Sequence, residues 1–225
     1  VSQVKEAFAQ VHSALGSDAG RKSLSTQFNT CASLVGASDN DTATFIGNLA
    51  GVFQGTVQYN DEIPGALNIA KICSTVLNQS SAIDGLAALL KMSQDGQCID
   101  NSYADMLKTL SNTTVDKGAT GVGDRQWIYQ TCTQFGYYQT CDANTTCLFG
   151  APSMTLKSNT DLCADLFGVS AAQAQKYVDF SLSYYGGNQP AGSNILFVNG
   201  HIDPWHWLSV LHDMGVQENA VFIEG

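Results

Sequence analysis

Residues 194–207 read NILFVNGHIDPWHW, and this stretch decides the expected fold. Its apolar part, residues 195–198, has the length and composition of a fully buried strand. Residues 199–200, Asn-Gly, have the turn chemistry that ends a strand. Asp203 follows on a loop, and Pro204 fixes the backbone just behind it. The stretch therefore predicts a buried strand that delivers an acidic side chain at its carboxyl end.

A second apolar run, residues 219–223, predicts another buried strand after a helix from Trp205 to Met214. Functional groups of open α/β sheets lie on loops beyond the carboxyl ends of the strands. Asp203 occupies such a position. The C-terminal part of the chain is therefore expected to belong to the α/β class.

Composition limits the partners of this chain. Its 225 residues suffice for one large or two small domains, and its net charge is −10 with only 10 Lys and Arg residues. This acidic balance argues against nucleic acid and anionic membrane surfaces as partners. Apolar stretches of the roughly 18 residues that a membrane helix needs are absent from the sequence.

Cysteines and glycosylation motifs indicate a secretory-pathway protein. The seven cysteines are Cys31, Cys73, Cys98, Cys132, Cys141, Cys147 and Cys163. Asn-x-Ser/Thr sequons occur at Asn40, Asn78, Asn112 and Asn144. Many spaced cysteines together with several sequons favour an oxidised, glycosylated, secreted protein. The odd cysteine count, the lack of a signal-peptide pattern and a final strand at the chain end predict a piece of a longer chain.

The first hundred residues predict helices. Apolar residues recur at helical spacing over 2–16, over 45–53, over 67–77 and over 83–90. Asp39 and Asp41 are expected to cap the second of these helices, and Ile63-Pro64 is expected to open the third. A short helix is expected around residues 106–110. Alternating strand patterns are absent from this half.

The following residues predict a loop and two more helices. Residues 113–123 are polar and glycine-rich, and the aromatic-dense 124–138 predicts a helix that runs into a turn. Ser170 and Gln173 form a capping box for a helix that Gly186-Gly187 ends.

The chemistry of the acid has two interpretations. Asp203 is either the acid of a catalytic triad, which orients a histidine, or an exposed turn aspartate. His201, His206 and His212 flank it, which raises two further possible roles, a metal site and a histidine base for Asp203. His206 and His212 are six residues apart and would lie on different faces of a helix, so no metal is expected.

A nucleophile is missing from the sequence. The chain contains no Gly-x-Ser-x-Gly elbow, so by itself it is catalytically incomplete. A group of aromatic residues is assigned either to a substrate pocket or to the core. The group comprises Trp127, Tyr129, Phe135, Tyr137 and Tyr138.

Three motifs carry a resemblance to a known family. They are GDRQWIYQTCT (123–133) continuing into FGYY (135–138), then SYYGG (183–187), then LFVNG (196–200) with DPWH (203–206). With these motifs the chain resembles the prolyl carboxypeptidase, dipeptidyl peptidase II and thymus-specific serine peptidase family, and most of all its thymus-specific branch. The resemblance covers the whole chain, but only the middle-to-late portion of the family's polypeptide.

The resemblance implies an α/β-hydrolase with an inserted helical cap domain. Residues 1–100 would be the cap, and residues 101–225 would be the C-terminal part of the hydrolase domain. Asp203 matches the triad aspartate, Trp205 matches a wall of the pocket for the residue that precedes the scissile bond, and Tyr138 falls near another pocket position. The nucleophilic serine would lie before Val1. Because the triad of α/β-hydrolases runs Ser, Asp, His along the chain, the histidine would lie after the last strand.

The resemblance also implies the disulfides. Cys31 would pair with Cys98 and Cys132 with Cys163, as in the family, and Cys73 would pair with a cysteine upstream of this chain. Cys141 and Cys147 would close a local loop.

The resemblance implies a secreted or lysosomal serine-type exopeptidase that hydrolyses peptides by acyl transfer and uses no cofactor. Whether cleavage is directed to proline stays open, as does a homo-oligomeric state. Two alternatives remain. One is a catalytically inactive family member that acts as an extracellular structural or binding protein. The other is a helical cap that acts as an independent binding module.

Overall fold

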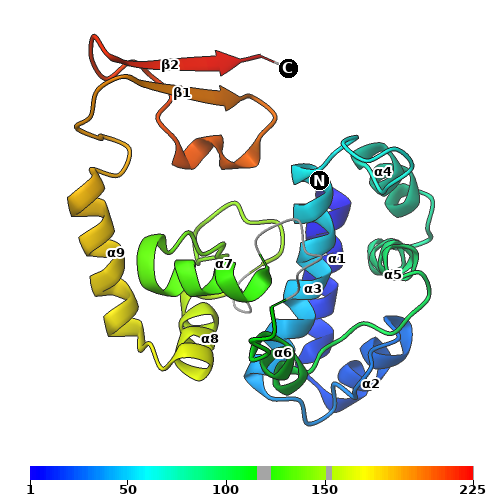
Figure 1. Ribbon diagram of the computed structural model, residues 1–225. Helices are drawn as coiled ribbons and strands as arrows, with labels where there is room; N and C mark the ends of the chain where they lie inside the picture. Colours follow the sequence, from blue (N-terminus) through cyan, green and yellow to red (C-terminus); the bar gives the residue numbers. More distant parts are fainter. Residues whose placement is uncertain (116–122, 151–153, 225) are drawn as a thin grey trace.

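The chain folds into helices followed by a pair of parallel strands. The computed structural model describes residues 1–115, 123–150 and 154–224 (Figure 1). The early helices are α1 (Ser2–Leu15), α2 (Asp18–Gln27), α3 (Asp39–Gln58), α4 (Ile69–Leu77), α5 (Ala82–Ser93) and α6 (Tyr103–Leu110). The later elements are α7 (Asp124–Gln130), the π-helical η1 (Thr131–Phe135), α8 (Leu156–Phe167), α9 (Ala171–Tyr185), β1 (Ile195–Gly200), the 3-10 helix η2 (Pro204–Leu208) and β2 (Glu218–Ile223).

Helices α1 to α5 enclose the main hydrophobic core, on the right of Figure 1. Phe8 and Val11 of α1 follow the helical spacing expected from the sequence and are fully buried. They meet Phe45, Leu49 and Leu89 in one cluster. The predicted helices over 2–16 and 83–90 are confirmed as α1 and α5, because each buries one continuous apolar face.

Helix α3 begins with a different cap from the predicted one. Ser38 is the N-cap residue and accepts a hydrogen bond from the Asp41 amide, while the Asp41 carboxylate accepts one from the Ser38 amide. Asp41 therefore completes a capping box and is not itself the cap. Helix α4 begins at Ile69 because the Asn68 side chain caps it, so Pro64 lies in the preceding turn and does not open a helix.

Two helices were not expected from the sequence. Helix α2 buries only Leu24, and its other side chains are mostly polar, so it lacks an apolar stripe that a periodicity argument could detect. Ser17 caps it by accepting a hydrogen bond from the Gly20 amide. Helix α8 begins with a capping box of Thr155 and Ser158 and buries Thr160 and Cys163.

A second, smaller cluster holds η1, α8 and α9 together. It comprises Cys132, Cys163, Val169 and Ala174. The predicted helix from the Ser170–Gln173 capping box is confirmed as α9. Gly186 ends it with φ of 84°, and an added Cβ there would lie 2.4 Å from the Gln189 carbonyl oxygen. Only glycine fits that turn. Residues 113–115 form the start of the predicted polar loop, and 116–122 lie outside the described residues.

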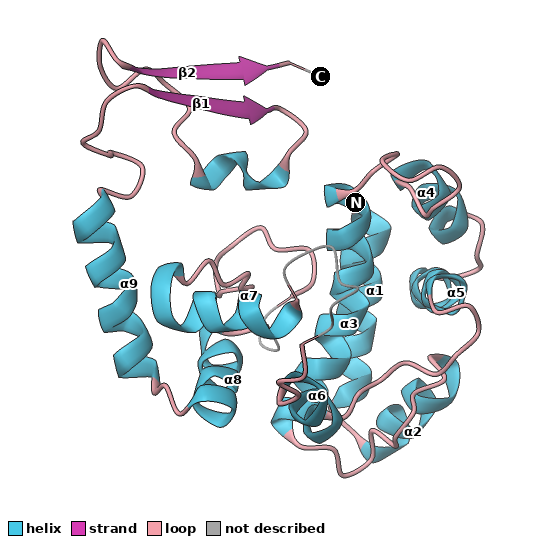
Figure 2. Cartoon of the chain, in the orientation of Figure 1, coloured by secondary structure: helices cyan, strands magenta, loops and turns pink. Residues whose placement is uncertain are grey.

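The strands form a parallel pair in which Ile195 lies opposite Glu218 and Gly200 lies opposite Ile223. Figure 2 shows the pair apart from the helical core, with η2 in the connection between the strands. Strand β1 includes Asn199 and Gly200, so the predicted turn at these residues is wrong. The ladder continues because both residues pair with β2.

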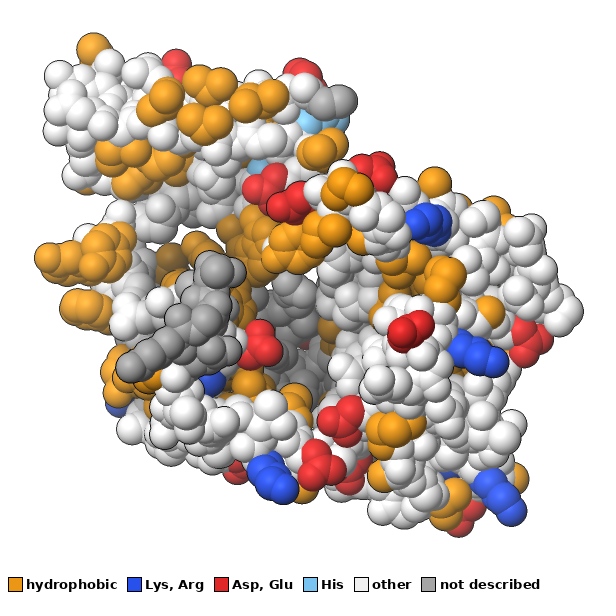
Figure 3. Space-filling model, turned by 45° about the vertical axis from the view of Figure 1, so that its right-hand side comes forward, with side chains coloured by type: hydrophobic (Ala, Val, Ile, Leu, Met, Phe, Trp, Pro, Cys, Tyr) orange, Lys and Arg blue, Asp and Glu red, His pale blue; other side chains and the backbone are white. Residues whose placement is uncertain are grey.

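Two further expectations for this unit are also wrong. Leu196 and Val198 are 60% and 57% exposed, so β1 is not fully buried, because within the described residues no second layer covers it. Apolar side chains gather over this unit at the top of the space-filling view (Figure 3). The predicted helix 205–214 is only the 3-10 helix η2. It ends at Leu208, because Ser209 adopts an extended backbone conformation.

Three disulfides close loops within the chain. They join Cys31 to Cys98, Cys132 to Cys163, and Cys141 to Cys147, and Cys73 is an exposed free thiol. The first two are the pairs that the resemblance implied, and the third is the expected local loop closure. Among the described residues, no helix combines the length and the apolar character needed to cross a bilayer.

Candidate active site

Asp203 lies in the turn just beyond the carboxyl end of β1. Its backbone amide donates to the Gly200 carbonyl over 3.2 Å, and it is the N-cap residue of η2. The Asp203 Oδ1 atom accepts a 2.9 Å hydrogen bond from the Trp205 amide. The side chain is exposed, and no other hydrogen bond from a described residue reaches its second carboxylate oxygen, Oδ2. The capping bond therefore fixes the carboxylate and leaves one oxygen open.

The nearby histidines contact other groups. His206 is buried, and its Nδ1 atom lies 2.6 Å from the backbone oxygen of Asp203. The His206 ring meets Phe222 of β2 edge-on at 5.4 Å. His201 Nδ1 lies 3.1 Å from the Glu224 carboxylate, and His212 is exposed. Within the described residues, no histidine hydrogen-bonds the Asp203 carboxylate, and no three metal-ligating side chains come together.

Trp205 is held at both ends. Its amide donates to Asp203, as described, and its indole Nε1–H donates to the Gln58 side-chain oxygen over 3.0 Å. The ring also meets Trp127 edge-on at 5.7 Å and Tyr137 at 6.4 Å. Two members of the aromatic group predicted from 124–138 thus pack against Trp205, whereas Tyr129 packs against Phe167 instead.

A cavity of about 630 Å³ lies beside this tryptophan. Its volume falls within the usual range of small-ligand pockets. Apolar side chains from α1, α3, α4 and η2 line most of it, together with the amides of Gln54, Gln58 and Gln139. Among the described residues that line it, no side chain carries a charge. The cavity suits an uncharged, apolar group that also offers hydrogen-bonding atoms.

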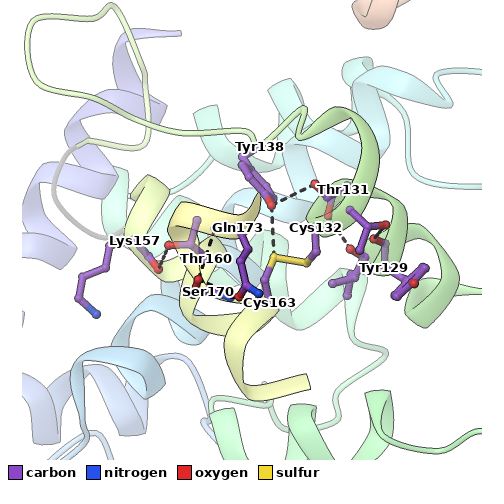
Figure 4. Close-up of a disulfide and its surroundings, with 11 residues drawn as sticks. Tyr129, Thr131, Cys132, Tyr138, Lys157, Thr160, Cys163, Ser170 and Gln173 are labelled. Carbon is purple, nitrogen blue, oxygen red and sulfur yellow. Dashed lines mark hydrogen bonds between the residues drawn. A yellow bond between two sulfur atoms is a disulfide. The ribbon is translucent and has the colours of Figure 1, made fainter. Parts of the chain in front are cut away.

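Tyr138 also lines the cavity, but its hydroxyl is engaged elsewhere. The hydroxyl donates to the Thr131 carbonyl over 3.1 Å and lies 3.2 Å from Cys163 Sγ (Figure 4). Burial raises the pKa of Tyr138, although the bond to Thr131 opposes this shift. A ligand in the cavity can therefore meet the ring of Tyr138 but not a free hydroxyl.

Sequence reasoning missed the contribution of α3 to this site. Gln54 and Gln58 are four residues apart, hence on one face of the helix, and both line the cavity. In the sequence, two glutamines next to Phe53 and Val57 give only a weak indication that this face of the helix lines a binding site. The contact of Gln58 with Trp205 joins residues 147 positions apart, which periodicity cannot detect.

The remaining predicted site residues lie away from Asp203 or at the cavity wall. Cys73 of α4 lines the cavity. The sequon residues Asn78, Asn112 and Asn144 are exposed, and Asn40 is half-buried in the first turn of α3.

The whole sequence, residues 1–225, matches the serine carboxypeptidase S28 family. The chain belongs to the serine carboxypeptidase S28 family. Its relatives include the human thymus-specific serine protease, 36% identical over 98% of this chain and 44% of that protein. The mouse thymus-specific serine protease is 35% identical over 96% of this chain and 43% of that protein. The bovine lysosomal Pro-X carboxypeptidase is 28% identical over 50% of this chain and 21% of that protein.

The chain spans less than half the length of the S28 relatives that it matches along its whole length. Its similarity to the thymus-specific proteases agrees with the branch that the sequence motifs indicated. The described geometry provides an acid, Asp203, that is bonded to Trp205, and a cavity that Trp205 lines.

Proposed function

We propose that this chain supplies the triad acid and part of the substrate cavity of a secretory-pathway serine peptidase. The observation that carries the proposal is the position of Asp203. Its carboxylate follows a parallel strand and is bonded to the backbone of Trp205, whose ring borders an uncharged cavity of about 630 Å³. Acid and cavity are therefore coupled through one residue.

The open oxygen of Asp203 would accept a hydrogen bond from the Nδ1–H of a histidine that lies outside this chain. That bond orients the imidazole and stabilises the imidazolium that forms when the histidine takes the proton of a serine hydroxyl. The serine oxygen then attacks the peptide carbonyl, and the histidine returns the proton to the leaving amine. Water hydrolyses the resulting acyl-enzyme by the same proton transfers in the second half of the reaction.

The fold assignment rests on the strand pair and on the helical core. Residues 195–200 and 218–223 form a parallel ladder with exposed apolar side chains, as a fragment of a larger sheet would. We assign them to the sheet of an α/β-hydrolase domain formed by residues 101–225 and by segments outside this chain. Residues 1–100 would be the inserted cap, supported by their own hydrophobic core.

The disulfides and sequons support a location in the secretory pathway, and the free Cys73 supports a disulfide to another segment of the protein. Three disulfides indicate an oxidising compartment. Asn40, Asn78, Asn112 and Asn144 would carry glycans, and Cys73 would pair with a cysteine of another segment of the same protein. The substrate would be a peptide with an uncharged residue at the cavity, bound by Trp205 and the ring of Tyr138.

The test uses the complete protein that contains this chain. A fluorophosphonate probe is expected to label a serine outside residues 1–225, and intact masses before and after reduction are expected to show a disulfide to Cys73. Asp203→Asn is expected to lower kcat by about 10⁴-fold, as loss of a triad acid does. Asp39→Asn, an exposed acid at the far end of α3, serves as the matched control.

Two results would contradict the proposal. A folded, complete protein that the probe does not label would instead be a structural or binding member of the family. An Asp203→Asn variant with the activity of Asp39→Asn would show that Asp203 is only a turn residue.

A further inference from the structure

Gln58 and Trp205 connect the helical core to the turn that carries Asp203. The indole Nε1–H of Trp205 donates to Gln58 Oε1 over 3.0 Å, and the amide of Trp205 donates to Asp203 Oδ1 over 2.9 Å. We propose that Gln58 is a positioning residue that sets the orientation of Trp205 and thereby selects the residue accommodated by the cavity. This inference rests on the proposed peptidase function.

The anchor of this contact is rigid. Gln58 is the last residue of α3, whose first turn is fixed by the Ser38–Asp41 capping box. Between the two ends, Phe45, Leu49 and Phe53 hold the helix in the main core. The Gln58 amide is therefore presented from a fixed backbone, and its bond to Trp205 defines how far the Asp203 turn lies from α3.

The other contacts of the indole do not fix its orientation in the same way. Trp127 at 5.7 Å and Tyr137 at 6.4 Å pack against the ring, and such aromatic contacts tolerate several arrangements. The hydrogen bond to Gln58 requires a defined donor–acceptor direction. Without it, the indole stays packed but can rotate into or out of the cavity that both residues line.

A substitution at Gln58 should alter its hydrogen bond to Trp205 without disturbing the hydrophobic core. Gln58 is exposed, so a substitution there leaves no void in the packed interior. Gln54, one helical turn earlier on the same face, lines the same cavity but makes no hydrogen bond to Trp205. It is the matched control position.

The kinetic test uses the complete protein and two peptides that differ only in the residue before the scissile bond, phenylalanine or alanine. Gln58→Met is expected to lower kcat/KM for the phenylalanine peptide about fivefold, mainly through KM, in keeping with the loss of one hydrogen bond. The alanine peptide, which is too small to press on the indole, should change less than twofold. Gln58→Glu keeps an acceptor and should restore the preference. Gln54→Met also removes an amide from the cavity but leaves the Trp205 hydrogen bond, so it should change kcat/KM for both peptides by the same factor.

A second readout needs no activity. Exchange of the Trp205 indole proton can be followed in protein labelled with ¹⁵N-tryptophan, with Trp205→Phe assigning the signal. Gln58→Met should speed this exchange, whereas Gln54→Met and Gln58→Glu should not.

The outcomes separate this inference from the proposed function. If Asp203→Asn abolishes activity while Gln58→Met matches Gln54→Met in both readouts, the role of Gln58 is refuted and the peptidase proposal stands. An equal loss for both peptides in Gln58→Met also refutes it, because a general structural defect would then explain the effect. If the unmodified protein has no reactive serine, both proposals fail.

Discussion

The Tyr103 hydroxyl donates a 2.8 Å hydrogen bond to the Asp165 carboxylate and so joins α6 to α8. Burial raises the pKa of the Tyr103 phenol well above its usual range, and the hydrogen bond and negative charge of Asp165, with the charge of Asp161, raise it further. The folded protein therefore keeps the phenol protonated at pH values at which the unfolded chain loses the proton.

Tyr103→Phe is expected to change how stability depends on alkaline pH. The folded pKa lies above the unfolded value, so the stabilisation is complete below about pH 10 and is lost as pH rises beyond it. At neutral pH the variant should lose about 1 kcal/mol, the usual net contribution of one hydrogen bond. Urea unfolding should show a steeper alkaline loss for the unmodified protein. Equal slopes would contradict the shift. Tyr59→Phe, at an exposed tyrosine whose hydroxyl makes no hydrogen bond in the described residues, is the control.

Asp41→Asn is expected to destabilise the protein at neutral pH and not at low pH. Burial acts to raise the pKa of Asp41, but hydrogen bonds from the Tyr103 amide and from Ser38 outweigh it, so the pKa is lowered. The stabilisation is therefore present above the unfolded value of about 3.9 and disappears as pH falls through the folded pKa. Thermal unfolding of Asp41→Asn and Asp39→Asn between acidic and neutral pH checks this. A constant difference between the two variants would refute it.

Removal of the Cys132–Cys163 disulfide should affect both stability and the cavity. The bond closes a loop with a sequence separation of 31, and loss of such a constraint costs about 3–4 kcal/mol in the chain-entropy account. Cys163 Sγ also lies beside the Tyr138 hydroxyl, so the ring that borders the cavity loses a support. A double Cys→Ser variant should unfold at lower denaturant and bind an apolar dye in the cavity more weakly. The corresponding Cys31–Cys98 variant, whose cysteines adjoin no residue that lines the cavity, should keep dye binding.

Cys73 is expected to react differently in two contexts. In this chain alone its thiol is exposed, so a maleimide should add to it under native conditions. In the complete protein we expect a disulfide to protect it, and labelling should require reduction. Cys73→Ser provides the unlabelled reference, and native labelling of the complete protein at Cys73 would exclude the disulfide.

The sequence predicted best those elements whose signal is local. The spacing of Phe8 and Val11 identified α1, and Ser170 with Gln173 identified the start of α9, because periodicity and capping depend only on nearby residues. Helix α2 escaped prediction because it buries only Leu24. The predicted extent of the helix after Asp203 was wrong because helix propensity does not detect the extended backbone at Ser209.

For the site, the sequence located the acid but not its surroundings. Asp203 follows from the strand before it, and Trp205 is its near neighbour. The partners of the Trp205 ring come from α3, from α7 and from the segment after η1, so they depend on tertiary packing that no local pattern encodes. The exposure of Leu196 and Val198 has the same cause. Apolar composition predicts that a strand is buried, but it does not identify the segment that packs on it.

The disulfides divide the chain into two covalently closed sections. Cys31–Cys98 lies within the first, whereas Cys132–Cys163 and Cys141–Cys147 lie within the second. Within the described residues no disulfide joins the two sections, so the peptide backbone between Cys98 and Cys132 is the covalent tether between them. Cutting that tether should yield two fragments that separate in denaturant without a reductant. In native buffer, contacts such as Gln58–Trp205 and Tyr103–Asp165 would hold the nicked halves together, so fragment reassociation measures the strength of the joint directly.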